Sequence, residues 1–156
     1  MGDYPEITIR PVGLVKNGIN ERMRHGWGEV ESELIIDPEL TELLDGLQNF
    51  SHIVVIYWMH KSAGTYPAKV HPRGISEAPL TGVFATRSPR RPNAIGVTTV
   101  ELLECNENKL RVRGLDAVHG TPIIDIKPYL PGDFVQNVRY PEWISRLDPS
   151  QEAWRK

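Results

Sequence analysis

The sequence predicts a mainly β protein, a small closed or nearly closed antiparallel β-barrel with one or two short helices. The first observation behind this fold class is a series of short runs rich in β-branched residues, separated by glycine, proline and polar turn residues. The second is that strands do not alternate with long helical patterns, which argues against a parallel α/β sheet. The third is that no GxGxxG follows a predicted strand and no GxxxxGK[ST] occurs, which excludes a dinucleotide fingerprint and a P-loop.

Most segments of the chain have the length and composition of short strands. Several segments alternate apolar and polar residues, and residues 51–60 form a continuous apolar run typical of a central strand. The polar residues 106–109 predict a hairpin turn. The predicted strands are residues 7–17, 27–36, 51–60, 82–86, 93–105, 110–118 and 122–130.

The remaining segments are a helix, a loop and a tail. Residues 37–47 are expected to form a short helix, because Asp37 can cap its first turn and its leucines form one stripe. Residues 61–81 contain several glycines and prolines without sustained periodicity, which predicts a long loop of the kind that is often functional. We expect a barrel domain over residues 1–138 and a tail over residues 139–156 that packs on the barrel or on a second subunit.

Charge is distributed unevenly along this chain of 156 residues. The net charge of -2 and the isoelectric point near 6.2 exclude a protein that is basic over its whole surface. Residues 1–59 carry a net charge of -6, whereas residues 60–100 carry six Lys or Arg against one Glu. Such a local positive block indicates a site for an anionic ligand, although a solvated loop would give the same count.

Cysteine and histidine usage bounds the chemistry and the compartment. Cys105 is the only cysteine, which excludes an internal disulfide and a cysteine-rich zinc site and is typical of a reducing compartment. The five histidines show no HxxxH or HxH spacing, so we expect no metal site. No apolar run approaches the roughly 20 residues that a membrane helix needs, so we expect a cytoplasmic protein without a membrane partner.

The segment GVFATRSPRRPNAIG, residues 82–96, places three arginines between two apolar stretches. Arginine binds carboxylates and phosphates through a planar fork, and the two prolines of the segment stiffen its turn. Arg87 lies nearest the predicted strand end and is a candidate for a pocket, whereas Arg90 and Arg91 are candidates for phosphate contact at the tip. A surface turn with an incidental charge cluster is the alternative.

Two further clusters place polar groups beside predicted strands. His60 and Lys61 follow a long apolar run, where a histidine can hydrogen-bond a ligand amine or carboxylate. In GLDAVHGTPIIDIKPYLP, residues 114–131, Asp116 lies near a turn at which a carboxylate can bind an amine or ribose hydroxyls. Asp125 lies within an apolar strand and therefore needs partners, and an ion pair with Lys127 on the same side of the strand would supply one.

The segment GVFATRSPRRPNAIG followed by LDAVHGTPIIDIKPYLP closely resembles the TsaA/YaeB family, also called the TrmO family. The family pattern reads GVFATRSxxRPNPIG and then LDxxDGTPxxDIKPY. The match extends upstream to GLVKN and covers about residues 6–131. The resemblance implies a small β-barrel, a homodimer, and S-adenosylmethionine as the cofactor. It also implies methylation of the exocyclic nitrogen of threonylcarbamoyl-adenosine beside the tRNA anticodon.

The resemblance also implies a cofactor pocket. Two positions depart from the family pattern: Ala94 stands where proline is common, and His119 stands where the pattern has aspartate. A histidine accepts a hydrogen bond only when it is neutral, so cofactor affinity or its pH dependence is expected to differ here. The residues that match pocket positions are His60, Lys61, Arg87, Leu115, Asp116, Ala117, Val118 and His119, with a further contact expected at Met23, Arg24 and His25.

The resemblance and the chemistry of the side chains together suggest a role for several residues. Arg87 suits the carboxylate of the cofactor, and Asp116 suits its ammonium or ribose. Asp125 is the candidate base for the acceptor nitrogen, with the ion pair to Lys127 as the alternative. The side chains expected to hold tRNA phosphates are Lys69, Arg73, Arg90 and Arg91.

Two other functions remain open at this stage. Bacterial members of the family often carry a C-terminal domain, and this chain ends about 25 residues after its DIKPY motif, so it resembles the short single-domain form. That length favours an S-adenosylmethionine-dependent enzyme acting on a small molecule or another RNA as the first alternative. The second is a cofactor-binding module without turnover, which the histidine at position 119 favours.

Overall fold

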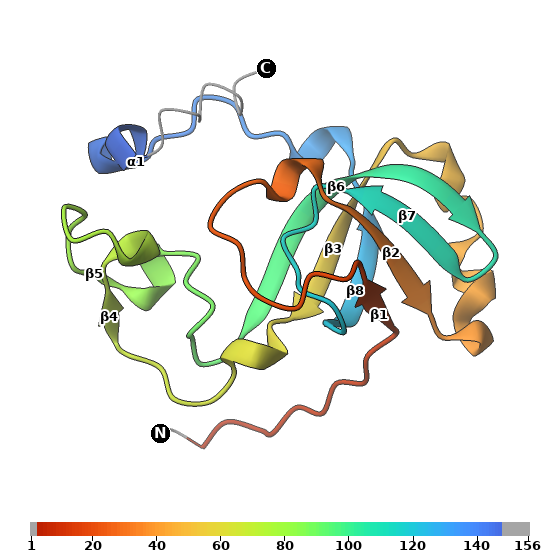
Figure 1. Ribbon diagram of the computed structural model, residues 1–156, viewed down its shortest axis with the longest axis horizontal. Coiled ribbons are helices and arrows are strands. Elements are labelled where there is room, and N and C mark those ends of the chain that lie inside the picture. Colours follow the sequence, from red (N-terminus) through yellow and green to blue (C-terminus); the bar gives the residue numbers. More distant parts are fainter. Residues whose placement is uncertain (1–2, 148–156) are drawn as a thin grey trace. The chain divides into compact units, whose positions relative to one another are not determined.

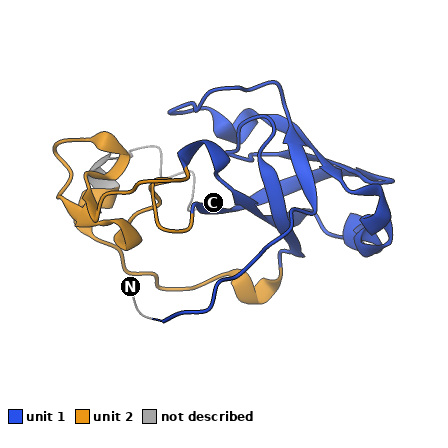
Figure 2. Cartoon of the chain, turned by 90° about the horizontal axis from the view of Figure 1, so that it is seen from below, with its two compact units in different colours: residues 1–62, 94–129 blue, residues 63–93, 130–156 orange. Residues whose placement is uncertain are grey.

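The computed structural model describes residues 3–147 of the chain. Internal contacts divide the chain into two compact units, which are blue and orange in Figure 2. The barrel unit consists of residues 1–62 and 94–129. The loop unit consists of residues 63–93 and 130–156.

Six strands of the barrel unit close into an antiparallel barrel (Figure 1). Their order around the barrel is β1, β2, β7, β6, β3 and β8, and β8 pairs again with β1. A closed sheet leaves no edge strand, which removes the unpaired backbone that an open sheet exposes. The predicted fold class is therefore confirmed. The strands are β1 (Gly13–Lys16), β2 (Glu31–Ile36), β3 (His52–Trp58), β6 (Ile95–Asn106), β7 (Lys109–Arg113) and β8 (Pro122–Pro128).

Alternation of side chains along each strand places one face inside the barrel. In β2, Leu34 and Ile36 are buried, and in β3, Ile53 and Val55 are buried, while their neighbours along the strand are more exposed. Burial of each such side chain contributes about 1.5–3 kcal/mol relative to exposure. The inward residues of the six strands therefore supply the main stabilisation of the unit.

A bulge in β8 decides which of its residues face outward. The register against β3 shifts between Ile123 and Asp125. An inserted residue changes the face that the following residues occupy. Ile126 accordingly packs against the core, whereas the side chains of Asp125 and Lys127 are about half or more exposed.

The helix predicted over residues 37–47 is replaced by two 3-10 helices, η2 (Pro38–Leu44) and η3 (Leu47–Asn49). Asp37 caps η2 as expected, because its carboxylate accepts the backbone N–H of Glu39 at 3.0 Å. The two helices are separated by Gly46, whose φ of 88° is a left-handed conformation that glycine adopts without strain. The break therefore follows from the glycine within the leucine-rich segment.

The strand predicted over residues 82–86 is wrong. β5 (Thr81–Gly82) ends there, and the 3-10 turn η6 (Val83–Ala85) follows it. Thr86 donates both its backbone N–H and its hydroxyl to the carbonyl of Val83, at 3.1 and 2.8 Å. This local closure satisfies the backbone without a sheet partner, which is how threonine competes with strand formation.

Three other predicted strands are shorter than expected. β1 begins only at Gly13, and the preceding segment includes Pro11, which has no N–H for a sheet ladder. β2 is preceded by the 3-10 turn η1 (Trp27–Glu29). β7 ends at Arg113, because Gly114 has a φ of 93° and turns the chain away.

Short elements make up the rest of the described chain. In the loop unit, β4 pairs only with β5. The described part of the tail predicted over residues 139–156 includes the helix α1, and residues 148–156 lie outside the described residues, so its packing stays a prediction. Within residues 3–147, no helix is long and apolar enough to cross a membrane. The short elements are η4 (His60–Ser62), β4 (Lys69–Val70), η5 (Pro72–Gly74), η7 (Pro131–Asp133) and α1 (Glu142–Leu147).

The pairing of Gly96 with Tyr57 gives a test of the packing inside the barrel. A Cβ on Gly96 would lie 2.4 Å from ring atoms of Tyr57, so Gly96→Ala must displace the ring. We expect Gly96→Ala to lower the free energy of unfolding by about 1–3 kcal/mol in urea denaturation. Gly28→Ala is the control, because a Cβ there meets nothing within 4 Å. Equal stability of the two variants would contradict the tight packing.

Candidate functional site

The segment 114–121 follows β7 and is anchored by backbone hydrogen bonds to β1 and the loop that follows it. His119 N–H donates to the carbonyl of Ile19, and Gly120 N–H donates to the carbonyl of Val15, both at 2.7 Å. Leu115 and Ala117 are buried in the core, so their side chains hold the segment and leave ligand contact to its backbone and to the residues between them.

Asn17 joins the segment 114–121 to strand β2 and to the loop after β1. Its side-chain N–H₂ donates to the hydroxyl of Ser32 at 3.0 Å and to the carbonyl of Ala117 at 2.9 Å. Its side-chain oxygen accepts the N–H of Ile19 at 3.0 Å. The sequence contains Asn17 in the GLVKN motif, but its role depends on a partner 100 residues away, which local patterns do not reveal.

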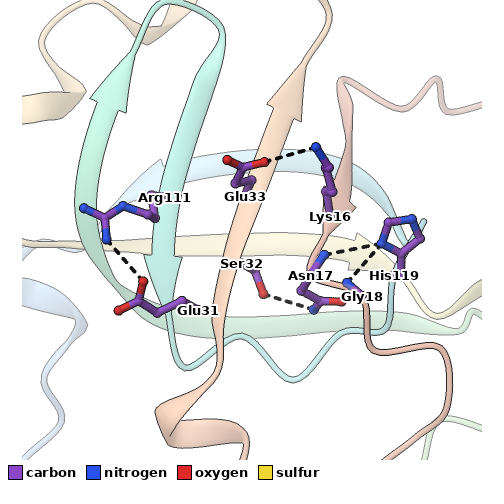
Figure 3. Close-up of a pocket in the computed structure, with 8 residues that line it drawn as sticks. All are labelled: Lys16, Asn17, Gly18, Glu31, Ser32, Glu33, Arg111 and His119. Atoms are coloured by element: carbon purple, nitrogen blue, oxygen red, sulfur yellow. Dashed lines mark hydrogen bonds and ion pairs between the residues drawn. The ribbon is translucent and has the colours of Figure 1, made fainter.

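The ring of His119 faces the same loop. Its Nδ1 accepts the backbone N–H of Asn17 at 3.4 Å and that of Gly18 at 3.3 Å (Figure 3). The aspartate of the family pattern would also offer an acceptor at this position, so the histidine preserves the hydrogen bonding to the loop.

Asp116 is held on the opposite side of the segment by residues that sequence analysis missed. One of its carboxylate oxygens accepts the hydroxyl of Tyr57 at 2.8 Å and also the hydroxyl of Thr98. Tyr57 pairs with Gly96 across β3 and β6, and the missing side chain of Gly96 makes room for the ring. The carboxylate of Asp116 is exposed, so it can also accept from a ligand amine or hydroxyl.

His60 and Lys61 lie in η4, directly after β3, and Lys61 bonds to the same loop. The ammonium of Lys61 donates to the backbone carbonyl of Asn20. Among the side chains that the structure describes, the Nδ1 of His60 is a buried nitrogen without a hydrogen-bond partner. An unsatisfied buried polar atom costs about 1–3 kcal/mol. A polar ligand group beside His60 would remove that cost, so the residues present fit a polar cofactor.

Residues 23–25, where a further cofactor contact is predicted, lie in a loop that a side-chain hydrogen bond from Trp27 closes. The indole N–H of Trp27 donates to the carbonyl of Met23 at 3.0 Å, which closes the loop on itself. Arg24 and His25 are exposed. The structure therefore places Met23 within a closed turn, and contact between residues 23–25 and a cofactor stays a prediction.

The predicted cations of the loop unit differ in how far they are already engaged. Arg87 and Arg90 are exposed, and Lys69 lies on β4. Arg91 is half-buried and donates to the carbonyl of Thr86 at 3.3 Å, and its contact with phosphate stays a prediction. Arg73, which has a φ of 56°, belongs to the same unit.

The ion pair expected as the alternative role of Asp125 is present. The ammonium of Lys127 lies 2.6 Å from one carboxylate oxygen of Asp125, and the other oxygen accepts the N–H of Ile126 at 2.9 Å. Both oxygens are therefore engaged on the outer face of the barrel. This geometry favours the structural explanation of Asp125 over a role as a base.

A shallow groove of about 360 Å³ lies on the outer face of the barrel beside His119 (Figure 3). Ion pairs form much of its wall: Lys16 lies 3.6 Å from Glu33, and Arg111 lies 3.2 Å from Glu31. Hydrogen bonds from Arg113 and Arg111 hold the pKa of Glu31 below its usual value. These charges satisfy one another, so the groove wall has a structural explanation.

The residues of the candidate site can be compared with known proteins. A family model described as the tRNA-methyltransferase O N-terminal domain matches residues 21–133. The chain belongs to the TrmO family. A relative from Methanothermobacter thermautotrophicus, named "Probable S-adenosyl-L-methionine-binding protein", is 49% identical over 128 residues, which are 80% of this chain and 90% of the relative.

Two other TrmO relatives differ from the chain in length. The human tRNA (adenine(37)-N6)-methyltransferase is 45% identical over 114 residues, which are 72% of this chain but 25% of the human protein. The crystal structure of TrmO from Pseudomonas aeruginosa superposes with a TM-score of 0.71 at 29% identity, and the match covers 86% of this chain and 61% of that one. The chain thus spans most of the archaeal relative and about a quarter of the human one.

The ion pairs of Glu31 predict how the barrel responds to acid. A lowered pKa means that the folded state favours the charged carboxylate, so its stabilisation is present above the usual value of 4.5 and is lost as the pH falls through the folded pKa. We expect the wild type to melt above Glu31→Gln at about pH 7, with the two melting temperatures converging below pH 4.5. Glu42→Gln is the control, and a constant difference at every pH would contradict this explanation.

The acceptor at position 119 predicts how firmly the loop after β1 is held. His119→Ala removes the group that accepts the backbone N–H groups of Asn17 and Gly18. We expect the protection of the Gly18 amide against hydrogen exchange to fall in this variant. His119→Asp keeps an acceptor and should protect the amide like the wild type, and an equal loss in both variants would refute the role of the acceptor.

Proposed function

We propose that this chain is an S-adenosylmethionine-dependent methyltransferase that acts on tRNA, with the exocyclic nitrogen of threonylcarbamoyl-adenosine beside the anticodon as the acceptor. The single observation that carries the cofactor assignment is the oriented, exposed carboxylate of Asp116. The buried Nδ1 of His60, which has no hydrogen-bond partner among the described residues, supports it. The names of the archaeal and mammalian relatives support the same cofactor and the same class of acceptor.

The cofactor would be held by groups that are already fixed. S-adenosylmethionine supplies an electrophilic methyl group on a sulfonium. Asp116 would accept its ammonium or ribose hydroxyls, because Tyr57 orients the carboxylate without neutralising it. His60 would bond a polar group through Nδ1, and the backbone of residues 115–119 would contact the adenine edge. Arg87 stays the predicted partner of the cofactor carboxylate.

The protein would accelerate transfer mainly by alignment. The acceptor nitrogen is amide-like and a poor nucleophile, so holding it in line with the methyl group and excluding water are the main contributions. Asp125 was the predicted base, but its two oxygens are bonded to Lys127 and Ile126. The proposed mechanism therefore assigns no proton transfer to Asp125.

Two further predictions belong to this function. Homodimer formation follows from the resemblance, and the outer face of β3 and β6 carries the exposed apolar residues Trp58, Ile95 and Val97 that an interface between copies would cover. A cytoplasmic location would give the protein access to tRNA. Size measurement of the purified protein tests the first of these predictions.

A binding module without methyl transfer is the second candidate function. The observation that favours it is a name: the archaeal relative that is 49% identical over 90% of its own length is named for cofactor binding rather than for methyl transfer. Both candidates share the cofactor site and differ only in turnover. A methyl-transfer assay on unmodified and threonylcarbamoyl-modified tRNA distinguishes them.

Calorimetric titration with S-adenosylmethionine tests the cofactor site. Asp116→Asn keeps an acceptor for Tyr57 but removes the charge, so we expect affinity to fall roughly 10- to 150-fold, the range of a hydrogen bond to a charged group. Asp125→Asn is the matched control and should bind like the wild type, because its carboxylate is engaged on the outer face. Equal affinities of the two variants would refute the role of Asp116, and wild type without binding would refute the proposed function.

A further inference from the structure

Phe84 projects from the loop unit on a backbone that is fixed at both ends. Its side chain is 77% exposed, although it lies in the middle of the tight turn η6. Val83, which is buried, donates its N–H to the carbonyl of Ala68 at 3.0 Å, and the carbonyl of Val83 accepts the N–H of Thr86 at 3.1 Å. The turn therefore presents the ring to solvent, so little backbone entropy is lost when a ligand contacts it.

Arg91 stands against this ring. Its guanidinium carbon lies 6.0 Å from the ring centroid, at the outer limit of a cation–π contact. Its donation to the carbonyl of Thr86 holds the guanidinium in place. Aromatic rings and guanidinium planes are protein groups on which nucleobases stack, and here the guanidinium lies over one face of the ring.

The charges around the ring distinguish it from an ordinary exposed phenylalanine, which alone would need no explanation. Residues 63–93 carry five Lys or Arg and one carboxylate. Within the described part of the chain, Arg87, Arg90 and Arg91 take part in none of the ion pairs, whereas Arg111 and Arg113 of the barrel are paired with glutamates. The positive charge next to Phe84 is thus available to phosphates.

A protein partner fits this surface less well than RNA does. The cores of protein interfaces are depleted of charge, whereas Phe84 is followed within seven residues by three arginines. Phe134 offers a contrast within the same unit: it is 67% exposed and its neighbour in η7 is the carboxylate of Asp133. Sites for single-stranded nucleic acid combine aromatic stacking with cations that follow the backbone, which is the pattern at Phe84.

We propose that the ring of Phe84, supported by the guanidinium of Arg91, is a stacking platform for a nucleobase of the RNA substrate. The inference rests on the proposed function, because it identifies a residue that would receive the RNA. A base beside the anticodon must leave its stack to be reached, and a fixed aromatic surface stabilises the splayed base. Arg87 and Arg90 would then lie next to the flanking phosphates or to the anionic end of the cofactor.

The test compares three variants of the full chain by fluorescence anisotropy with a labelled tRNA anticodon stem-loop. Phe84→Leu keeps an apolar side chain and removes the aromatic face, so we expect the Kd to rise roughly 5- to 150-fold. Phe84→Trp should bind at least as tightly as the wild type. The matched control Phe134→Leu should bind like the wild type. The slope of log K against log salt should not change in any of them, because no charge is removed.

Calorimetry with S-adenosylmethionine and thermal melting accompany each variant. RNA affinity that is unchanged in Phe84→Leu, or lost equally in Phe134→Leu, would overturn the platform. Loss of cofactor affinity in place of RNA affinity would show that the ring contacts the adenine of the cofactor and would also overturn it. If Phe84→Leu fails to fold, Phe84→Trp provides a second test. The proposal requires the stem-loop to quench the extra tryptophan fluorescence that this variant has over the wild type. Fluorescence that is not quenched would refute stacking.

Failure of the platform and failure of the proposed function give different results. A wild type that methylates tRNA while Phe84→Leu keeps the same RNA affinity and the same KM refutes only the platform. A wild type that neither binds the stem-loop nor methylates tRNA refutes the proposed function and the platform together.

Discussion

The side chain of Asn17 is the interaction on which the candidate site depends. Its three hydrogen bonds connect the end of β1, the buried hydroxyl of Ser32 in β2 and the backbone of Ala117. Each such bond contributes about 1 kcal/mol, but loss of the amide would also leave a buried hydroxyl without this donor, which costs more than the bond itself. The segment that carries Asp116 and His119 is therefore positioned by a part-buried polar contact beside the apolar core.

A second anchor acts independently on the same segment. Tyr57 reaches Asp116 only because Gly96 leaves the space that its ring occupies. Asn17 fixes the segment through backbone and Tyr57 fixes one carboxylate through its hydroxyl, so the charge of Asp116 is oriented without a cation to neutralise it. A carboxylate held by neutral donors keeps its capacity to bind a ligand ammonium, which an internal ion pair such as that of Asp125 does not.

The sequence was sufficient for the parts of this structure that depend on local pattern. Strand alternation predicted the barrel, which the structure confirms. Motif resemblance assigned a set of residues that includes Arg87 to one cofactor pocket. Arg87 belongs to the loop unit, the others named for that pocket belong to the barrel unit, and their contact with a cofactor stays a prediction. The contacts of Asn17 and Tyr57 could not be predicted, because they depend on register between strands far apart in the chain. The strand predicted over residues 82–86 was wrong for a different reason. Composition alone favoured a strand, but the hydroxyl of Thr86 closes a turn there.

The arginines of β7 and those of residues 82–96 differ in their ion pairing, which shows how a protein with an acidic average would bind the proposed RNA substrate. On the barrel, Arg111 and Arg113 each contact two glutamates, and hydrogen bonds to Glu31 raise the pKa of both guanidiniums. Those two arginines form ion pairs within the barrel. Among residues 3–147, the arginines of the segment 82–96 take part in none of the ion pairs, and Arg91 donates to a backbone carbonyl. At physiological salt, screening limits electrostatic attraction to roughly 8 Å, so a polyanion responds to this local block rather than to the net charge of -2.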